Sequence, residues 1–229
     1  MRALVVLLCL LTGPAFAGPW PRDPGSVYVY SGHEIGEDGA IDGWSSLYAE
    51  VGLPRGFTAT LDTGGHLGPL TTGALPDGRV ALTLGRPILS SDEARARRPA
   101  WLEPWRLGVE AGLGYERRDD GVQARRLITG LSVGRGMQTR FGDGWIAGSA
   151  RLASGGDLDA RANLGAVAGV KPRPWLQVEL GLFAEHDDGW SITLAPAAQV
   201  PVWRLGAVRA AVLAKDDGTA MQFGWVSEF

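Results

Sequence analysis

The chain has 229 residues, with 22 lysines and arginines, 25 aspartates and glutamates, and a formal net charge of −3. Its hydrophobic content of 45% and charged content of 21% are ordinary for a folded protein and exclude wholesale disorder. The near-neutral charge argues against a general nucleic-acid binder, and the length fits one domain or at most two small ones.

Residues 1–17 have the pattern of a secretory signal peptide. Arg2 supplies the positive start, residues 3–12 form an apolar run, and Ala15 and Ala17 are the small residues of a cleavage site. The alternative is a buried N-terminal helix. We expect export and cleavage after Ala17, which leaves 229 − 17 = 212 residues. Residues 18–25 then form a short periplasmic segment before the folded domain, 26–229.

The rest of the chain is compatible with only a few destinations. Its single cysteine, Cys9, lies inside the signal peptide, so the mature chain has no disulfide and no cysteine-ligated zinc site. We expect no metal and no cofactor. No later stretch reaches the roughly 18 consecutive apolar residues of a membrane-spanning helix. The periplasm, the medium and a β-barrel in an outer membrane remain.

Apolar and polar residues alternate with a period of two, which is typical of strands with two unlike faces. From Leu176 onward, one face carries leucine, valine and alanine, and the other carries Gln177, Glu179 and Glu185, with Phe183 as the exception. Asp-Gly pairs, a strong signal for hairpin turns, separate many of the runs. They occur at 38–39, 42–43, 77–78, 120–121, 143–144, 188–189 and 217–218.

These patterns predict an all-β fold with no domain boundary. The predicted strands cover residues 26–35, 44–53, 56–63, 79–86, 105–116, 123–135, 145–153, 158–171, 175–186, 190–200, 204–215 and 219–229. Twelve strands are preferred, and eight or ten remain as alternatives. The register of 204–215 is open, because Arg209 lies among apolar residues. A charged stretch at 91–98 is the one candidate helix.

The composition of the two faces favours a membrane barrel over a periplasmic β-sandwich. The apolar face is rich in Leu, Val and Ala and ends in aromatic residues, which suits lipid with an aromatic girdle. The opposite face mixes small residues with isolated charges, which suits a wet lumen. A sheet in lipid must close, because unpaired backbone groups are costly there. We therefore predict a closed antiparallel up-and-down transmembrane β-barrel. Its girdle residues are Trp105, Trp175 and Trp203 at strand starts, with Tyr115 and Trp190 by the opposite turns.

The C-terminal strand resembles that of bacterial outer-membrane β-barrel proteins, whose last strand alternates hydrophobic residues and ends in an aromatic. Met221, Phe223, Trp225 and Phe229 match this pattern, whereas Ser227 departs from it. The resemblance implies that these four residues are an assembly signal read by the barrel-assembly machinery. It also implies a Gram-negative outer membrane, contact with its lipids, and transit with periplasmic chaperones. The oligomeric state is left open.

Charged residues on the polar face are the candidate site. Arg106, Glu110, Arg126, Arg151, Arg161 and Glu179 are predicted to line the lumen. Such charges either form a constriction that filters small solutes or pair with one another and plug a narrow barrel. A channel or transporter-like pore and a sealed structural or surface-interaction barrel are therefore both kept as functions.

An enzyme is the remaining and weaker alternative. The three histidines, His33, His66 and His186, lie near predicted outer loops, and Ser191 follows His186 across a turn. A Ser–His pair at a barrel rim would suit an outer-membrane lipid hydrolase. No nucleophile elbow and no zinc-protease motif accompanies the pair, so we expect no enzymatic activity.

Overall fold

The computed structural model describes residues 20–37, 43–66, 77–88, 105–202 and 206–229. Twelve strands and one 3-10 turn, η1 (Pro54–Gly56), make up the fold. The strands are β1 (Val27–Gly36), β2 (Trp44–Gly52), β3 (Thr58–His66), β4 (Gly78–Pro87), β5 (Arg106–Arg117), β6 (Gln123–Thr139), β7 (Gly142–Ser154), β8 (Arg161–Arg173), β9 (Leu176–His186), β10 (Trp190–Pro201), β11 (Ala207–Lys215) and β12 (Gly218–Glu228).

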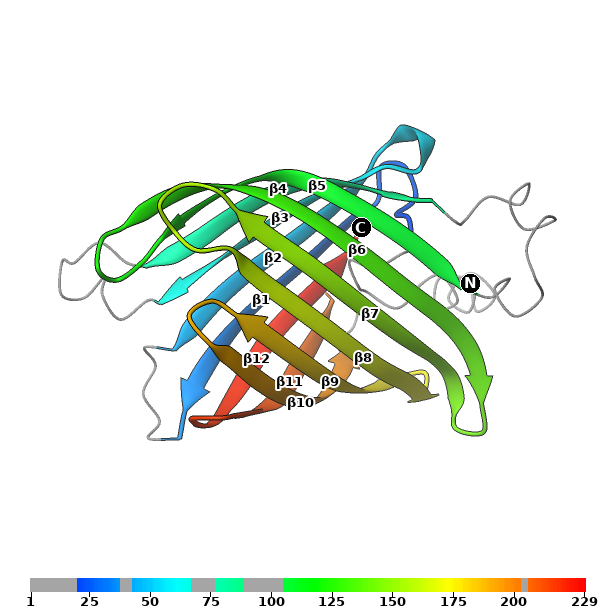
Figure 1. Ribbon diagram of the computed structural model, residues 1–229. Coiled ribbons are helices and arrows are strands. Elements are labelled where there is room, and N and C mark those ends of the chain that lie inside the picture. The colour runs from blue at the N-terminus through cyan, green and yellow to red at the C-terminus, as the bar shows by residue number, and fades with distance from the viewer. Residues whose placement is uncertain (1–19, 38–42, 67–76, 89–104, 203–205) are drawn as a thin grey trace.

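The strands form a single closed antiparallel barrel. Each strand pairs with its neighbours in the chain, and β1 pairs with β12 to close the ring. Figure 1 shows the strands strongly tilted, with β1 beside β12 although they come from opposite ends of the sequence. The closing seam is extended by two backbone hydrogen bonds between Val27 and Phe229, of 2.9 and 3.0 Å. The predicted barrel of twelve strands is confirmed, and the β-sandwich alternative is wrong.

The two faces of the barrel are inverted relative to a water-soluble protein. Outward positions leave large apolar side chains exposed, such as Leu82 at 61% and Leu113 at 69%. Inward positions bury charged groups, such as Glu50 at 2% and Arg126 at 3%. This arrangement keeps polar groups out of contact with lipid and satisfies every strand edge by closure.

Strand β11 settles the register that the sequence leaves open. Val208 and Val212 are each 41% exposed and point outward, whereas Ala207, Ala211 and Leu213 are buried inside the barrel. The alternation therefore places the side chain of Arg209 in the lumen. Small alanines on this inner face leave room for the arginine.

The hairpin of β6 and β7 differs most from its prediction. Asp143-Gly144 lies within β7 rather than at a turn, and the chain reverses at 140–141. β5 pairs with β6 only as far as Arg106 with Gly134, so β6 runs on beyond its partner to Thr139. Figure 1 shows this hairpin projecting past the neighbouring strands. Asp-Gly is a turn signal only where flanking registers allow it, and pairing with β8 extends the strand instead.

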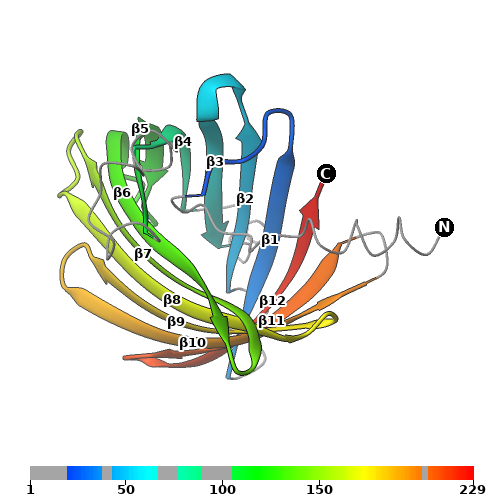
Figure 2. The same cartoon turned by 90° about the vertical axis from the view of Figure 1, so that its right-hand side faces the viewer.

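An even number of strands brings both ends of the barrel domain to one mouth, called here the terminal mouth; the other is the far mouth. Figure 2, turned by 90°, shows the strands surrounding one interior. Exposed aromatics stand near strand ends at both mouths: Trp175 and Trp190 are each 58% exposed and Tyr115 is 41% exposed. Trp203 and the candidate helix at 91–98 lie outside the described residues. In the described ranges, no helix has the length and apolarity to cross a membrane.

Candidate functional site: the lumen

The barrel encloses a cavity of about 1120 Å³ to which all twelve strands contribute lining residues. The cavity follows from the period-2 alternation, because glycines and small polar residues occupy many inward positions. Its charged lining is nearly balanced, with nine carboxylates and seven basic groups. The acidic residues are Glu34, Glu50, Asp62, Glu110, Glu116, Glu179, Glu185, Asp216 and Asp217, and the basic residues are Arg79, Arg86, Arg126, Arg151, Arg161, Arg209 and Lys215.

The centre of the lumen is crossed by one arginine. Arg151 of β7 contacts Glu110 of β5, with Nε 2.9 Å from Oε1, and Asp62 of β3, with Nη1 2.7 Å from Oδ2. Glu110 also accepts a hydrogen bond of 2.9 Å from Thr83. These side chains are 23–31% exposed, so water reaches them. The cluster ties together strands that are not adjacent and narrows the lumen.

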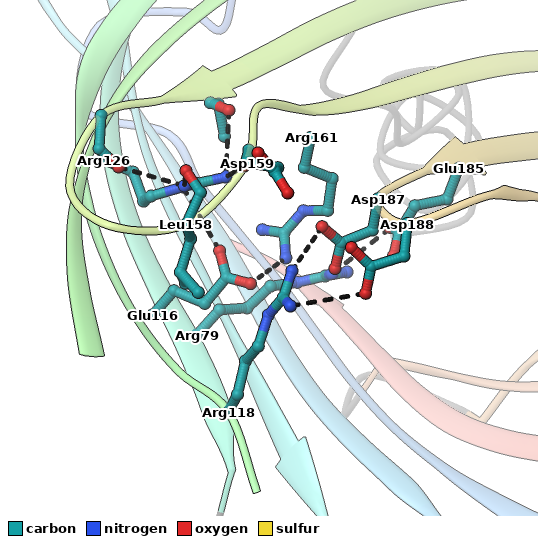
Figure 3. Close-up of polar contacts among 12 residues, drawn as sticks. Arg79, Glu116, Arg118, Arg126, Leu158, Asp159, Arg161, Glu185, Asp187 and Asp188 are labelled. Carbon is teal, nitrogen blue, oxygen red and sulfur yellow. Dashed lines mark hydrogen bonds and ion pairs between the residues drawn. The ribbon is translucent and has the colours of Figure 1, made fainter. Parts of the chain in front are cut away.

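The far mouth carries ion pairs that span the opening (Figure 3). Arg79 of β4 lies 3.4 Å from Glu185 of β9, on strands five positions apart in a ring of twelve. Arg118 lies 2.6 Å from Asp187 and 3.5 Å from Asp188, across the same mouth. We call these five residues the far-mouth bridges. They join nearly opposite walls, so their side chains set the width of the opening.

Arg126 is a structural clamp rather than a free lumen charge. Its guanidinium donates to the backbone carbonyls of four residues that end β7 and form the next turn. The acceptors are Ala153, Gly155, Leu158 and Asp159, at 2.5–3.2 Å. Glu116 lies 3.5 Å from Arg126 and 2.7 Å from Arg161, so one carboxylate neutralises two guanidiniums (Figure 3). These contacts hold the β7–β8 turn against the rim.

A second clamp lies at the terminal mouth and fastens the seam between the first and last strands. Arg22, from the segment before β1, places Nε 2.5 Å from Glu50 and Nη1 2.7 Å from Glu228. The Tyr48 hydroxyl donates to Glu50 at 2.6 Å, and the Arg22 guanidinium lies 4.7 Å from the Tyr28 ring centroid. We call these five residues the seam cluster. It ties β2 to β12 across β1 and so reinforces the closure of the barrel.

Glu179 belongs to a third group of lumen contacts. Its carboxylate accepts from Gln177 at 2.6 Å and lies 3.4 Å from Arg209, which donates to Gln222 at 3.0 Å. Glu179 is 5% exposed, so this group packs against the wall. Five of the six predicted lumen residues therefore line the cavity. Arg106 is half-buried at the start of β5 and is not part of the lining.

The structure does not bring together the predicted Ser–His pair. His186 lies opposite Trp190 in the β9–β10 hairpin, whereas Ser191 lies opposite Glu185. Neighbouring residues in a strand project to opposite faces, so His186 and Ser191 are on different sides of the wall. A different pair is formed at the outer surface, where Nδ1 of His33 lies 2.8 Å from Oγ of Ser45. No carboxylate among the described residues contacts His33.

Several lumen residues, chiefly in the first third of the chain, are not among the predicted ones. Asp62, Arg79 and Glu50 lie on strands whose alternation is short and interrupted. A signal was present, since Thr58, Thr60 and Asp62 alternate with apolar neighbours on one strand. Arg22 carried no periodic signal at all, because it precedes the first strand.

The last strand has the outward pattern on which the resemblance rested. Met221 is 50% exposed, Phe223 is 43% exposed and Phe229 is 78% exposed. Trp225 donates a hydrogen bond of 2.8 Å to the Ser227 hydroxyl. The serine at the departing position therefore satisfies the indole N–H, which lipid would leave unpaired.

No protein-family model and no curated protein matches the sequence. Among solved structures, the chain is similar to the KdgM porin, with a TM-score of 0.63 and 9% identity over 88% of this chain and 99% of that chain. KdgM porin in complex with disordered oligogalacturonate gives a TM-score of 0.60 and 9% identity, over 89% and 99%. An outer membrane channel from Pseudomonas putida F1 has a TM-score of 0.48 and 13% identity, over 94% of this chain and 100% of that chain. The fold is that of outer-membrane porin barrels.

Proposed function

We propose that the protein is a narrow, water-filled channel for small solutes in the outer membrane of a Gram-negative bacterium. The observation that carries the proposal is the cavity of about 1120 Å³, lined from all twelve strands inside a wall whose leucines face outward. Eight-stranded barrels fill with side chains, whereas larger ones leave space for solvent. Twelve strands with many inward glycines fall on the open side of that range.

The solute path runs past two narrow points. The first is the central cluster of Asp62, Glu110 and Arg151, and the second is formed by the far-mouth bridges. Arg161 and Glu179 also line this path, and each is paired with a group of opposite charge. Arg126 shapes the far mouth indirectly, because it holds the β7–β8 turn in place. Arg106 stands near the terminal mouth and contributes to the field there.

The orientation and assembly of the barrel follow from the same proposal. After cleavage behind Ala17, both ends of the mature chain lie on the periplasmic side, and the far mouth faces outward. Met221, Phe223, Trp225 and Phe229 form the signal for the barrel-assembly machinery, and periplasmic chaperones deliver the unfolded chain. The exposed leucines contact outer-membrane lipids.

The balanced lumen favours uncharged solutes. One structural neighbour, the KdgM porin, is in complex with oligogalacturonate, which is a polyanion. Here six of the seven basic groups that line the lumen have carboxylate partners, as with Arg151 and Arg161. A polyanion would have to break these pairs, and a neutral solute would not.

A sealed structural barrel is the second candidate, favoured by the ion pairs that cross the lumen. The two functions differ in conductance. We expect the folded protein to give unitary current steps in a planar lipid bilayer. Arg151→Ala leaves Asp62 and Glu110 without their cation, so the reversal potential in a KCl gradient should shift toward potassium. Leu152→Ala, at the adjacent outward position, is the matched control. Folded protein that is silent in the bilayer would instead establish the sealed barrel.

A further inference from the structure

Phe183 is an apolar ring on the polar face of the barrel. It breaks the alternation of β9, where Gln177, Glu179 and Glu185 are its companions on the inward face. The side chain is 40% exposed although it lines the cavity, so one side of the ring meets the solvent of the lumen. The exposed side of the ring is therefore available for contact with a solute in the lumen.

Two glycines form a shelf beneath this ring. A Cβ atom at Gly181 would fall 2.5 Å from Cε2 of Phe183, and one at Gly165 would fall 3.3 Å from Cδ1. Cε2 and Cδ1 are opposite atoms of the ring, so the ring lies along the wall across β8 and β9. Its other side is left facing the solute path. Side chains at either glycine would push the ring into the lumen.

Polar groups flank the ring at the same level and one level closer to the far mouth. Thr193 lies directly opposite Phe183 on β10, and Ser149 lies opposite Gly165 on β7. Asn163 and Ser191 both lie opposite Glu185, which is the next inward-facing residue of β9 after Phe183. Among the described residues, none hydrogen-bonds to these hydroxyl and amide side chains, so they remain available to a ligand.

Two charged groups beside this wall are neutralised by ion pairs. Glu185 is paired with Arg79, and Lys215, opposite Thr193, lies 2.6 Å from Glu34. An aromatic ring face with a ring of hydroxyl and amide groups suits a pyranose, whose C–H face stacks on the electron-rich ring while its equatorial hydroxyls form hydrogen bonds at the edge. Paired charges select against an acidic sugar.

We propose that Phe183, on its shelf of Gly165 and Gly181, is a subsite that binds a pyranose ring of a neutral oligosaccharide in transit. The assignment rests on the proposed channel function, which it deepens by naming the solute class. Ser149, Asn163, Ser191 and Thr193 are the hydrogen-bonding groups of this subsite.

The test is sugar block of the ion current in a planar bilayer, with maltohexaose and cellohexaose as neutral probes and trigalacturonate as the acidic one. We expect at least one neutral probe to interrupt the current. Phe183→Ala should raise the half-blocking concentration about three- to tenfold, the range of an aromatic stacking contact. Phe183→Trp should preserve or tighten the block. Leu182→Ala, which removes an outward side chain from the same strand, should leave it unchanged.

Calorimetric titration of the folded protein in detergent separates failure of the subsite from failure of the channel. A silent protein that binds a neutral probe, and loses that binding in Phe183→Ala, would refute the channel and keep the subsite. A conducting protein whose block is unchanged by Phe183→Ala would refute the subsite and keep the channel. Absence of binding by both neutral probes, or tighter binding of trigalacturonate, would also overturn the proposal.

Discussion

The seam cluster and the far-mouth bridges use the same ion-pair chemistry in two different environments. In the seam cluster, the side chains of Arg22 and Glu50 are 9% and 2% exposed. In the far-mouth bridges, those of Arg79 and Glu185 are 33% and 38% exposed. Removing one partner from a buried ion pair leaves the other charge away from water, which is costly. In an exposed pair, water solvates the remaining charge and the cost is small. The seam pairs therefore contribute mainly to stability, and the bridges mainly to the width of the opening.

The largest effect is expected at the seam. Arg22→Ala leaves the Glu50 carboxylate buried without its cation, which should lower the free energy of unfolding by about 3–5 kcal/mol. Urea unfolding in lipid vesicles, followed by tryptophan fluorescence, measures it. The double variant Arg22→Ala, Glu50→Gln removes the stranded charge and should recover much of the loss. If Arg22→Ala lowered the free energy of unfolding by less than about 1 kcal/mol, the seam pairs would be no more stabilising than exposed ion pairs.

The same change of carboxyl to amide at a buried and an exposed position sharpens the comparison. Glu116→Gln removes the charge shared by Arg126 and Arg161 and should cost about 2 kcal/mol, the scale of a hydrogen bond to a charged group. Glu185→Gln at the far mouth should cost less than about 1 kcal/mol. Both values come from the same unfolding measurement. Equal losses would show that burial does not distinguish the two regions.

Removing a bridge should change conductance more than stability. Arg79→Ala takes away a side chain that reaches toward the opposite wall, so the unitary conductance in a planar bilayer should rise. The free energy of unfolding should change by less than about 1 kcal/mol. Val80→Ala, at the adjacent outward position, should alter neither. An unchanged conductance in Arg79→Ala would mean that the narrowest point lies elsewhere, at the central cluster.

The smallest expected effect is that of salt concentration on the conductance, and it should act through the far-mouth bridges alone. The screening length falls from about 10 Å at 0.1 M to about 3 Å at 1 M salt, which weakens exposed pairs far more than buried ones. Conductance divided by the conductivity of the solution should therefore rise slightly with KCl concentration. In the double variant Arg79→Ala, Arg118→Ala this ratio should stay constant. A rise of the same size in that variant would assign the effect to another part of the lumen.

Local pattern was enough to predict the barrel, because each strand shows its two faces to lipid and lumen independently of the others. Charges such as Glu110 and Arg151 were predicted to be inward for the same reason. Their partners were not predicted, since the pairing of Arg151 with Asp62 depends on strands that approach only when the ring closes. Arg22 lay outside any periodic segment, and its contact with Glu50 exists only in the assembled seam.

Turn chemistry was less decisive than strand chemistry. Gly155 and Gly156 adopt positive φ angles of 109° and 72° in the connection between the predicted strands 145–153 and 158–171, where a residue with a Cβ would be strained. Asp143-Gly144 has the same type of signal but is held in β7 by pairing on both sides. Tertiary pairing decided between the two, and no local pattern carries that information.

The overhang of β6 and β7 gives the barrel a lopsided outline. At its tip, the Arg140 guanidinium lies 4.5 Å from the ring centroid of Phe141, which is 56% exposed. A cationic and an aromatic group together favour the layer between lipid headgroups and water. Because strand pairing is continuous around the barrel, the barrel moves as one body. Anchoring the β6–β7 hairpin at the membrane surface therefore fixes the depth and tilt of the whole barrel in the membrane.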